Sequence, residues 1–156
     1  MIVVSNSTPL IALSRIKKFN LLKEYFGEIS IPKEVFDEVA IRGRNLSGSE
    51  EVASVNWIKV EDVVNKIAVE SLSMTLDRGE AEAIVLAKEK DALLIIDDGE
   101  GRRAAEFFGL KITGTIGILL LASEDGKLNL KTAIDDLMAV GFRLSEKEYK
   151  RILNLN

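Results

Sequence analysis

Six acidic or amide side chains stand where apolar runs of the sequence end or in the stretches that follow them. They are Asn6, Glu38, Glu80, Glu82, Asp97 and Asp98. Carboxylate and amide oxygens are the ligands that Mg²⁺ and Mn²⁺ prefer in proteins. The adjacent Asp97 and Asp98 repel each other unless a cation or solvent screens their charges. With Glu38 and Glu80 they could form an oxygen-only cluster that binds one or two such ions and activates water at a phosphodiester.

The composition leaves few other routes to catalysis. The 156 residues include no histidine and no cysteine, which excludes a Ser-His-Asp triad, a thiol nucleophile, a disulfide framework and a thiolate zinc site. The formal net charge is −4, so no overall basic surface indicates nucleic acid. The apolar segment 116–122 is far shorter than the ~20 residues that cross a bilayer, and the N-terminus lacks a basic signal-peptide start. We therefore expect a soluble cytoplasmic protein.

Each acidic residue also has an explanation that requires no function. A glutamate in the first turn of a helix, as expected for Glu80, is favoured by the helix dipole. The Asp-Asp-Gly segment at 97–99 is an ordinary turn sequence, and Glu38 is typical of a solvated helix face. Residues two apart on a helix point in nearly opposite directions, so Glu80 and Glu82 share a site only if the helix begins at Glu80. The combination of the acids, and not any single one, indicates a site.

Short apolar runs alternate with amphipathic stretches, a pattern typical of an α/β domain with a mostly parallel sheet. The expected strands are 2–5, 29–31, 57–60, 92–96 and 111–113. The expected helices are 10–16, 19–26, 32–40, 49–55, 63–74, 80–89, 100–108, 115–122, 130–140 and 145–153. Thr8 predicts the N-cap of the first helix, with Pro9 at its first position, and 77–79 should form a turn. Sites in open parallel sheets form at the carboxyl ends of strands, so several of the acids should meet there.

The sequence resembles the PIN-domain proteins, the metal-dependent nuclease fold of many prokaryotic toxin–antitoxin ribonucleases, to which the flap-endonuclease fold is related. The segment IVVSNSTPLIAL looks like the first-strand motif of the family, and ISIPKEVFDEV is similar to the second motif. LDRGEAEAIVLA resembles the third, and ALLIIDDGEGRRAAEFFGLKITGTIGILLLA looks like the fourth strand with its acid, the next helix and the fifth strand. The resemblance covers nearly the whole chain in order. It is greatest for a poorly characterised subfamily with the SN-S/T-x-PL start and the GEAEAI segment.

This resemblance implies one PIN-like domain over residues 1–156, a three-layer α/β/α fold with a central, mostly parallel sheet of about four to five strands. It implies a Mg²⁺- or Mn²⁺-dependent endoribonuclease in which metal-activated water attacks the phosphodiester in line. The implied catalytic acids are Glu38, Glu80 and Asp98. The implied metal ligands are Asn6, Glu38, Glu80, Glu82, Asp97 and Asp98. Either Asp97 or Asp98 could be the acid of the fourth motif, and the alignment favours Asp98.

The chain departs from the family pattern at the first acid, where it has Asn6. An amide can bind a metal ion through its carbonyl oxygen but contributes no charge, so binding of a hard dication should be weaker. The alternative function is therefore a catalytically weak or inactive PIN-like module that binds nucleic acid or a protein.

The resemblance also implies an RNA substrate and, for a toxin, an antitoxin protein as partner. Arg42, Arg44 and Arg102 are candidates for RNA binding, although each could equally be part of a solvated surface. The glycine-containing loop that holds Arg42 and Arg44 is better placed to reach a phosphate backbone. The apolar segments 116–122 and 130–140 could bury a homodimer face, but a core position explains the same residues.

Two further functions fit parts of the sequence less well. Gly99-x-Gly101-x-x-Ala104 outlines a dinucleotide-binding loop, yet the preceding aspartates would face the pyrophosphate with negative charge, and the strand comes late in the chain. A phosphoacceptor receiver domain needs an acidic pair after the first strand, where this chain has Asn6.

Overall fold

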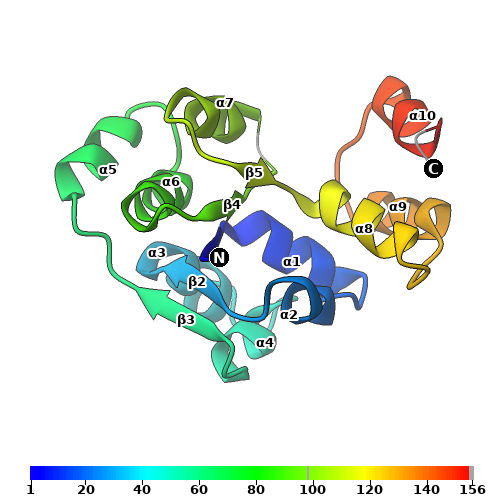
Figure 1. Ribbon diagram of the computed structural model, residues 1–156. Helices are drawn as coiled ribbons and strands as arrows, with labels where there is room; N and C mark the ends of the chain where they lie inside the picture. Colours follow the sequence, from blue (N-terminus) through cyan, green and yellow to red (C-terminus); the bar gives the residue numbers. More distant parts are fainter. Residues whose placement is uncertain (98, 155–156) are drawn as a thin grey trace.

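Within residues 1–97 and 99–154, which the computed structural model describes, five strands pair in the order β3-β2-β1-β4-β5, and every pairing is parallel. They are β1 (Val3–Ser5), β2 (Ile29–Pro32), β3 (Ile58–Glu61), β4 (Leu93–Ile95) and β5 (Ile112–Thr113). The sheet grows in one direction from β1 to β3 and in the other from β4 to β5 (Figure 1). The boundary between β1 and β4 is thus the topological switch point, where ligands bind beyond the carboxyl ends of the strands.

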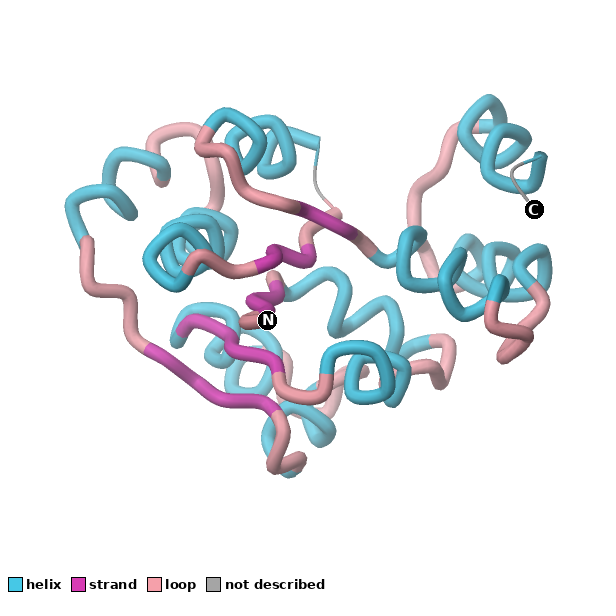
Figure 2. The backbone as a smooth tube through the Cα atoms, viewed as in Figure 1, coloured by secondary structure: helices cyan, strands magenta, loops and turns pink. Residues whose placement is uncertain are grey.

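Helices cover both faces of the sheet (Figure 2). They are α1 (Ser7–Arg15), α2 (Asn20–Phe26), α3 (Lys33–Phe36), α4 (Ser49–Ser54), α5 (Lys66–Leu72), α6 (Arg78–Lys90), α7 (Gly99–Phe107), α8 (Thr115–Glu124), α9 (Leu130–Ala139) and α10 (Glu146–Asn154), with a π-helical segment η1 (Asp37–Arg42) directly after α3. The three-layer α/β/α fold with a parallel sheet is confirmed.

Alternating side chains of the strands build two separate cores. Val3 and Ile95 pack with α1, α2, α8 and α9 on one face, whereas Val4 and Leu94 pack with α5, α6 and α7 on the other. Successive residues of a strand point to opposite faces, so both faces of the central strands are apolar. This explains why these strands appear in the sequence as continuous apolar runs.

The first helix starts earlier than the sequence pattern indicates. The prediction of an N-cap at Thr8 is wrong, because α1 begins at Ser7 and Asn6 occupies the N-cap position. The backbone N–H of Asn6 donates to the carbonyl of Ile95 (3.0 Å), so pairing with β4 continues to residue 6 and the helix begins at once. Pro9 lies within the first turn, where its missing N–H leaves no helix bond unmade.

The predicted turn at 77–79 is also wrong. Asp77 is the N-cap of α6, and Arg78 and Gly79 are already helical. Asp77 and Glu80 form a reciprocal capping box, which places Glu80 in the first turn and not at the first helical residue. The spacing of an N-cap residue and a glutamate three positions later is itself a known sequence signature of a helix start.

The apolar segment 116–122 lies within α8. No helix among the described residues is long and apolar enough to cross a membrane. Ile118, Leu119 and Ala122 are buried in the chain's own core, which accounts for the apolar character of this segment. A homodimer face remains a prediction.

Candidate active site

Two buried polar residues, Asn6 and Ser7, directly follow β1 at the switch point. Asn6 and Ser7 are 4% and 6% exposed. The side chain of Asn6 does not cap α1, so the helix leaves it available for another role. The Ser7 hydroxyl is buried and has no hydrogen bond of ordinary geometry among the described residues, although it is near enough to Glu38 to lower the pKa of that carboxyl group. Buried polar groups normally have a partner, so this position is unusual within the chain.

Glu38 lies in η1, in the segment that follows β2. Helix α3 is only four residues long before the backbone widens into the π-helical segment, whereas the sequence pattern predicts one helix from 32 to about 40. π-helical segments often occur at functional sites. Glu38 Oε1 is buried and has no hydrogen bond of ordinary geometry within residues 1–97 and 99–154. It contacts Gly79 so closely that a Cβ at that position would overlap it.

The surroundings of Glu38 are predominantly negative. Burial raises the pKa of its carboxyl group, and the nearby charges of Asp77 and Glu34 raise it further. The charge of Arg42 and the hydroxyl of Ser7 act in the opposite direction on the pKa but do not offset these effects. Glu38 is therefore a half-buried carboxylate with one buried oxygen, and an added cation would stabilise its charged form.

Glu80 is held in place by the start of α6 and by α7. Its backbone N–H donates to Asp77 Oδ1 (2.8 Å), and its Oε1 accepts from the backbone N–H of Asp77 (3.3 Å). A Cβ at Gly101 would lie 3.3 Å from Glu80 Oε2 and only 2.6 Å from Cδ1 of Ile96. Gly101 thus allows α7 to pack closely on β4 and Glu80, which explains this glycine without any dinucleotide.

These contacts connect four segments that are distant in the sequence. Ser7, the first residue of α1, faces Glu38 of η1, and Glu38 contacts Gly79 in the first turn of α6. Glu80 of the same turn then reaches Gly101 of α7. The structure therefore brings Ser7, Glu38 and the first turn of α6 together. The predicted set of metal ligands stays a prediction.

Glu82 points into a different environment. Its Oε1 accepts from the backbone N–H of Glu34 (3.2 Å), and its Oε2 pairs with Nε of Arg78 (3.2 Å). Because α6 begins two residues before Glu80, the condition under which Glu80 and Glu82 would share a site is not met. Glu82 instead links α6 to α3 through its hydrogen bond with Glu34.

Asp97 follows β4, and its side chain binds the first residue of α8. Its two carboxylate oxygens accept hydrogen bonds from the backbone N–H (2.8 Å) and the hydroxyl (2.6 Å) of Thr115. Burial raises the pKa of Asp97 above its ordinary value, and the bonds from Thr115 and the charge of Arg102 offset this rise only in part. Asp98 lies outside the described residues, so its assignment as a catalytic acid stays a prediction.

The three candidate arginines have different environments. Arg42 is exposed and paired with Glu34, with 2.6 Å between Nη2 and Oε1. Arg44 is exposed in the loop after η1, and its side chain has no ion pair within the described part of the chain. Arg102 is half-buried and donates from Nη1 to the carbonyl of Ile96 (2.7 Å). Their role in RNA binding stays a prediction.

Sequence reasoning did not find two residues that organise the site. Asp77 was assigned to a turn although its spacing to Glu80 is that of a capping box. Thr115 carries no signal of its own, but Gly114 before it is the N-cap of α8 and has no side chain to bond the helix N-terminus. That absence requires an acceptor from elsewhere, and Asp97 supplies it.

The donors suit a divalent ion such as Mg²⁺ or Mn²⁺, although the described residues alone do not complete a site. Among residues 1–97 and 99–154 no three carboxylates lie close enough together to hold a metal ion, and the predicted set needs Asp98 as well. All donors are oxygens, as hard cations require. Glu38 contributes a buried oxygen that has no hydrogen bond of ordinary geometry in the described part of the chain, and a cation would supply a favourable interaction there.

The fold is an open parallel α/β domain, and acidic residues lie near its topological switch point. The family model DUF3368, described as a PIN domain, matches residues 2–156, and the chain belongs to this PIN-domain family. The chain is similar in structure to a PilT N-terminus domain protein, SSO1118, from the hyperthermophilic archaeon Sulfolobus solfataricus P2. The TM-score is 0.54 at 18% sequence identity, over 78% of this chain and 93% of that one. This likeness concerns the fold.

No curated protein sequence matches the chain. PIN domains are commonly nucleases, and they typically use divalent metal ions. Membership of this family accounts for the glycine pattern of α7 and the acids at the strand ends without a dinucleotide-binding or receiver fold.

Proposed function

We propose that the protein is a Mg²⁺- or Mn²⁺-dependent endoribonuclease that hydrolyses phosphodiester bonds of RNA. The observation that carries this proposal is the Oε1 atom of Glu38, which is buried, has no hydrogen bond of ordinary geometry among the described residues, and lies against the helix turn that bears Glu80. The net effect of its surroundings is to raise the pKa of this carboxyl group. A carboxylate in such a position favours a cation. Family membership supports the nuclease class.

Glu38, Glu80 and Asp98, with the side-chain carbonyl of Asn6, would hold the divalent ion. When bound, such an ion polarises the phosphate and lowers the pKa of water. The protein's own contribution is to keep these oxygens in place. The capping box fixes Glu80, and the packing of Gly79 fixes Glu38. Asp97 and Arg102 anchor the end of β4 through Thr115 and the carbonyl of Ile96.

Substitution of Glu80 by Gln tests the site without removing its structural role. Gln still accepts in a capping box, so Glu80→Gln should fold normally but lose the negative charge. We expect Mn²⁺-dependent cleavage of a single-stranded RNA to fall by about 100-fold or more. Glu82→Gln is the matched control, because it removes the same charge two residues away, outside the site. Equal cleavage by the parent and by Glu80→Gln would contradict the proposal.

A second candidate is a catalytically weak or inactive module, and Asn6 is the observation that favours it. Asn6→Asp separates the two candidates, because it restores the charge that the family carries at this position. If the site is a weakened nuclease, Asn6→Asp should increase Mn²⁺ affinity and cleavage. If the module has lost catalysis altogether, neither the parent nor Asn6→Asp will cleave RNA at any Mn²⁺ concentration.

The cellular role belongs to the same proposal. A toxin of a toxin–antitoxin pair would act on cytoplasmic RNA and be inhibited by a small antitoxin protein. Growth arrest upon expression of the parent, but not of Glu80→Gln, would support this role. Normal growth with a parent that cleaves RNA in vitro would contradict it.

A further inference from the structure

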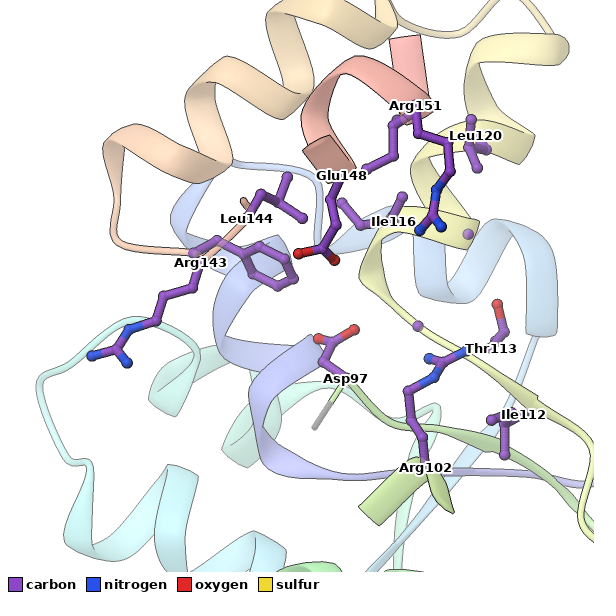
Figure 3. A pocket seen from close by; sticks show the side chains of 14 residues that line it. Asp97, Arg102, Ile112, Thr113, Ile116, Leu120, Arg143, Leu144, Glu148 and Arg151 are labelled. Carbon is purple, nitrogen blue, oxygen red and sulfur yellow. The ribbon is translucent and has the colours of Figure 1, made fainter. Parts of the chain in front are cut away.

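A pocket of about 460 Å³ opens beside the end of β4, on the side of the sheet that carries β5 (Figure 3). Asp97 and Arg102 line it from the β4 side, and α8, the segment before α10 and α10 itself close it. Its volume is in the range of small-molecule sites in proteins, about 300–1,000 Å³. The pocket is next to the candidate metal site but shares only the Asp97 region with it.

Charged side chains of both signs line the pocket. Arg102 and Arg151 extend their guanidinium groups toward each other across it, while Asp97 and Glu148 face each other beside them (Figure 3). The charge of Asp97 is met by two hydrogen bonds from Thr115. Arg151, in contrast, makes no ion pair or side-chain hydrogen bond within the described part of the chain.

Glu148, the second acid of the pocket, interacts with the start of α10. Its Oε1 accepts from the backbone N–H of Ser145 (3.2 Å), and this bond lowers the pKa of Glu148, as does the charge of Arg151. Glu148 is therefore ionised and an acceptor only. Arg143 adds a third positive charge at the rim, although its side chain points away from the interior (Figure 3). The lining thus carries three arginines and two carboxylates.

The remaining wall is apolar. Ile116 and Leu120 of α8 and Phe142 before α10 form this surface. A flat apolar group could lie against it while a phosphate meets the guanidinium groups. Arg102 donates one hydrogen bond to the carbonyl of Ile96 and keeps donors for a ligand, since a guanidinium carries five N–H groups.

We propose that this pocket binds one nucleotide of the RNA strand, which rests on the proposed function of the neighbouring site. Arg102 and Arg151 bind the phosphate, because guanidinium groups pair with phosphate through charge-assisted hydrogen bonds. The base lies against Ile116 and Leu120. Glu148 accepts a hydrogen bond from an amino group on the edge of the base, as carboxylates do in nucleic-acid recognition. Guanine offers such donors, whereas uracil lacks an exocyclic amino group.

The test is a binding titration without metal, so that it is independent of cleavage. The parent protein in EDTA is titrated with GMP, with UMP and with a fluorescently labelled single-stranded RNA. Free GMP and the RNA distinguish a mononucleotide site from a strand-binding site. We expect measurable GMP binding that is stronger than UMP binding, and tighter binding of the RNA because neighbouring phosphates add contacts.

Arg151→Ala and Lys147→Ala form the matched pair of variants. Both remove one positive charge from α10, but Lys147 is exposed and does not line the pocket. We expect Arg151→Ala to weaken GMP and RNA binding about tenfold and to reduce the salt dependence of RNA binding by about 0.7 in log–log slope, the value for one phosphate contact on a single strand. Lys147→Ala should change binding less than twofold. Glu148→Gln should reduce the preference for GMP over UMP, because the amide oxygen of Gln is a weaker acceptor than a carboxylate.

The outcomes separate this inference from the nuclease proposal. Loss of binding in Arg151→Ala supports the pocket even if the parent cleaves no RNA. Equal binding by Arg151→Ala and the parent overturns the pocket even if Glu80→Gln abolishes cleavage. Equal losses in Arg151→Ala and Lys147→Ala also overturn it, because they would reflect general attraction between charges. RNA binding without any GMP binding would exclude a mononucleotide site.

Discussion

The carboxylate of Asp97 caps the first turn of α8 through Thr115, with 2.8 Å to its backbone nitrogen and 2.6 Å to its hydroxyl. The helix needs this remote acceptor because its N-cap is Gly114. A side chain at Gly114 would lie 2.6 Å from Asp97 Oδ1 and 2.9 Å from Nη1 of Arg102. The glycine, the aspartate and the threonine therefore form one unit that holds the end of β4.

Loss of the Thr115 hydroxyl should destabilise the fold. Thr115→Val keeps the shape of this fully buried side chain but leaves Asp97 with one hydrogen bond fewer. We expect a loss of about 1.5–3 kcal/mol in the free energy of unfolding, the range for hydrogen bonds to charged groups, measured by urea denaturation. Thr115→Ser retains the hydroxyl and should preserve most of this hydrogen bond. If Thr115→Val is as stable as Thr115→Ser, the bond does not anchor the strand end.

Neutralisation of Glu38 should stabilise the metal-free protein and remove its response to metal. Glu38→Gln eliminates a buried charge whose pKa is raised by burial, Asp77 and Glu34. In EDTA its Tm should exceed that of the parent. Mn²⁺ should raise the Tm of the parent, because a ligand that binds only the folded state stabilises it, but should not raise that of Glu38→Gln.

Asp37→Asn is the control for this experiment, since it removes a charge from the adjacent residue. It should retain the Mn²⁺ response of the parent. An undiminished Mn²⁺ response in Glu38→Gln would contradict the assignment of Glu38 as a metal ligand.

The contact between Gly79 and Glu38 predicts that the effect of Gly79→Ala on the free energy of unfolding changes sign when Glu38 is replaced. Gly→Ala in a helix normally stabilises by about 0.5–1 kcal/mol, but here the Cβ would overlap Glu38 Oε1. Gly79→Ala should therefore destabilise the parent, and the same change should stabilise Glu38→Ala, in which the overlapping atoms are gone. Thermal or urea unfolding of the four proteins measures this coupling. Additive effects would show that Glu38 moves away without cost.

The ion pair between Lys90 and Glu61 should make stability depend on pH. Nζ of Lys90 lies 2.8 Å from Glu61 Oε1 and joins the end of α6 to the edge strand β3. Lys90 and Ser30 lower the pKa of Glu61 below its ordinary value of 4.5. The folded state thus favours the ionised form, and the stabilisation is present above pH 4.5 and lost as the pH falls through the lowered pKa.

Glu61→Gln should accordingly cost about 0.5–1 kcal/mol at pH 7, and the difference from the parent should shrink as the pH falls below 4.5 and through the lowered pKa of Glu61. Urea denaturation over this pH range measures it. A cost that is the same throughout the range would assign the effect to packing and not to the charge.

The sequence by itself determined the layers and the order of the elements. Apolar runs such as Ala92–Ile96 predict strands because both of their faces must be covered, and amphipathic stretches predict the helices that cover them. The same patterns placed Glu38, Glu80 and the pair of aspartates near strand ends or helix starts. Local chemistry also gives a signal at Ser145 and Glu148, whose types and spacing are those of a capping box, and this capping box is present in the structure.

Only the tertiary structure decided which of these side chains act together. Glu82 has the same residue type as Glu80 and lies two positions away, yet it pairs with Arg78 because α6 begins before Glu80. Asp97 is occupied by Thr115, which is 18 residues away in the sequence and carries no motif. Whether an acid has a partner or stays unpaired depends on contacts between segments that are distant along the chain, and sequence periodicity does not record such contacts. The isolation of Glu38 Oε1, on which the proposed metal site depends, is of this kind.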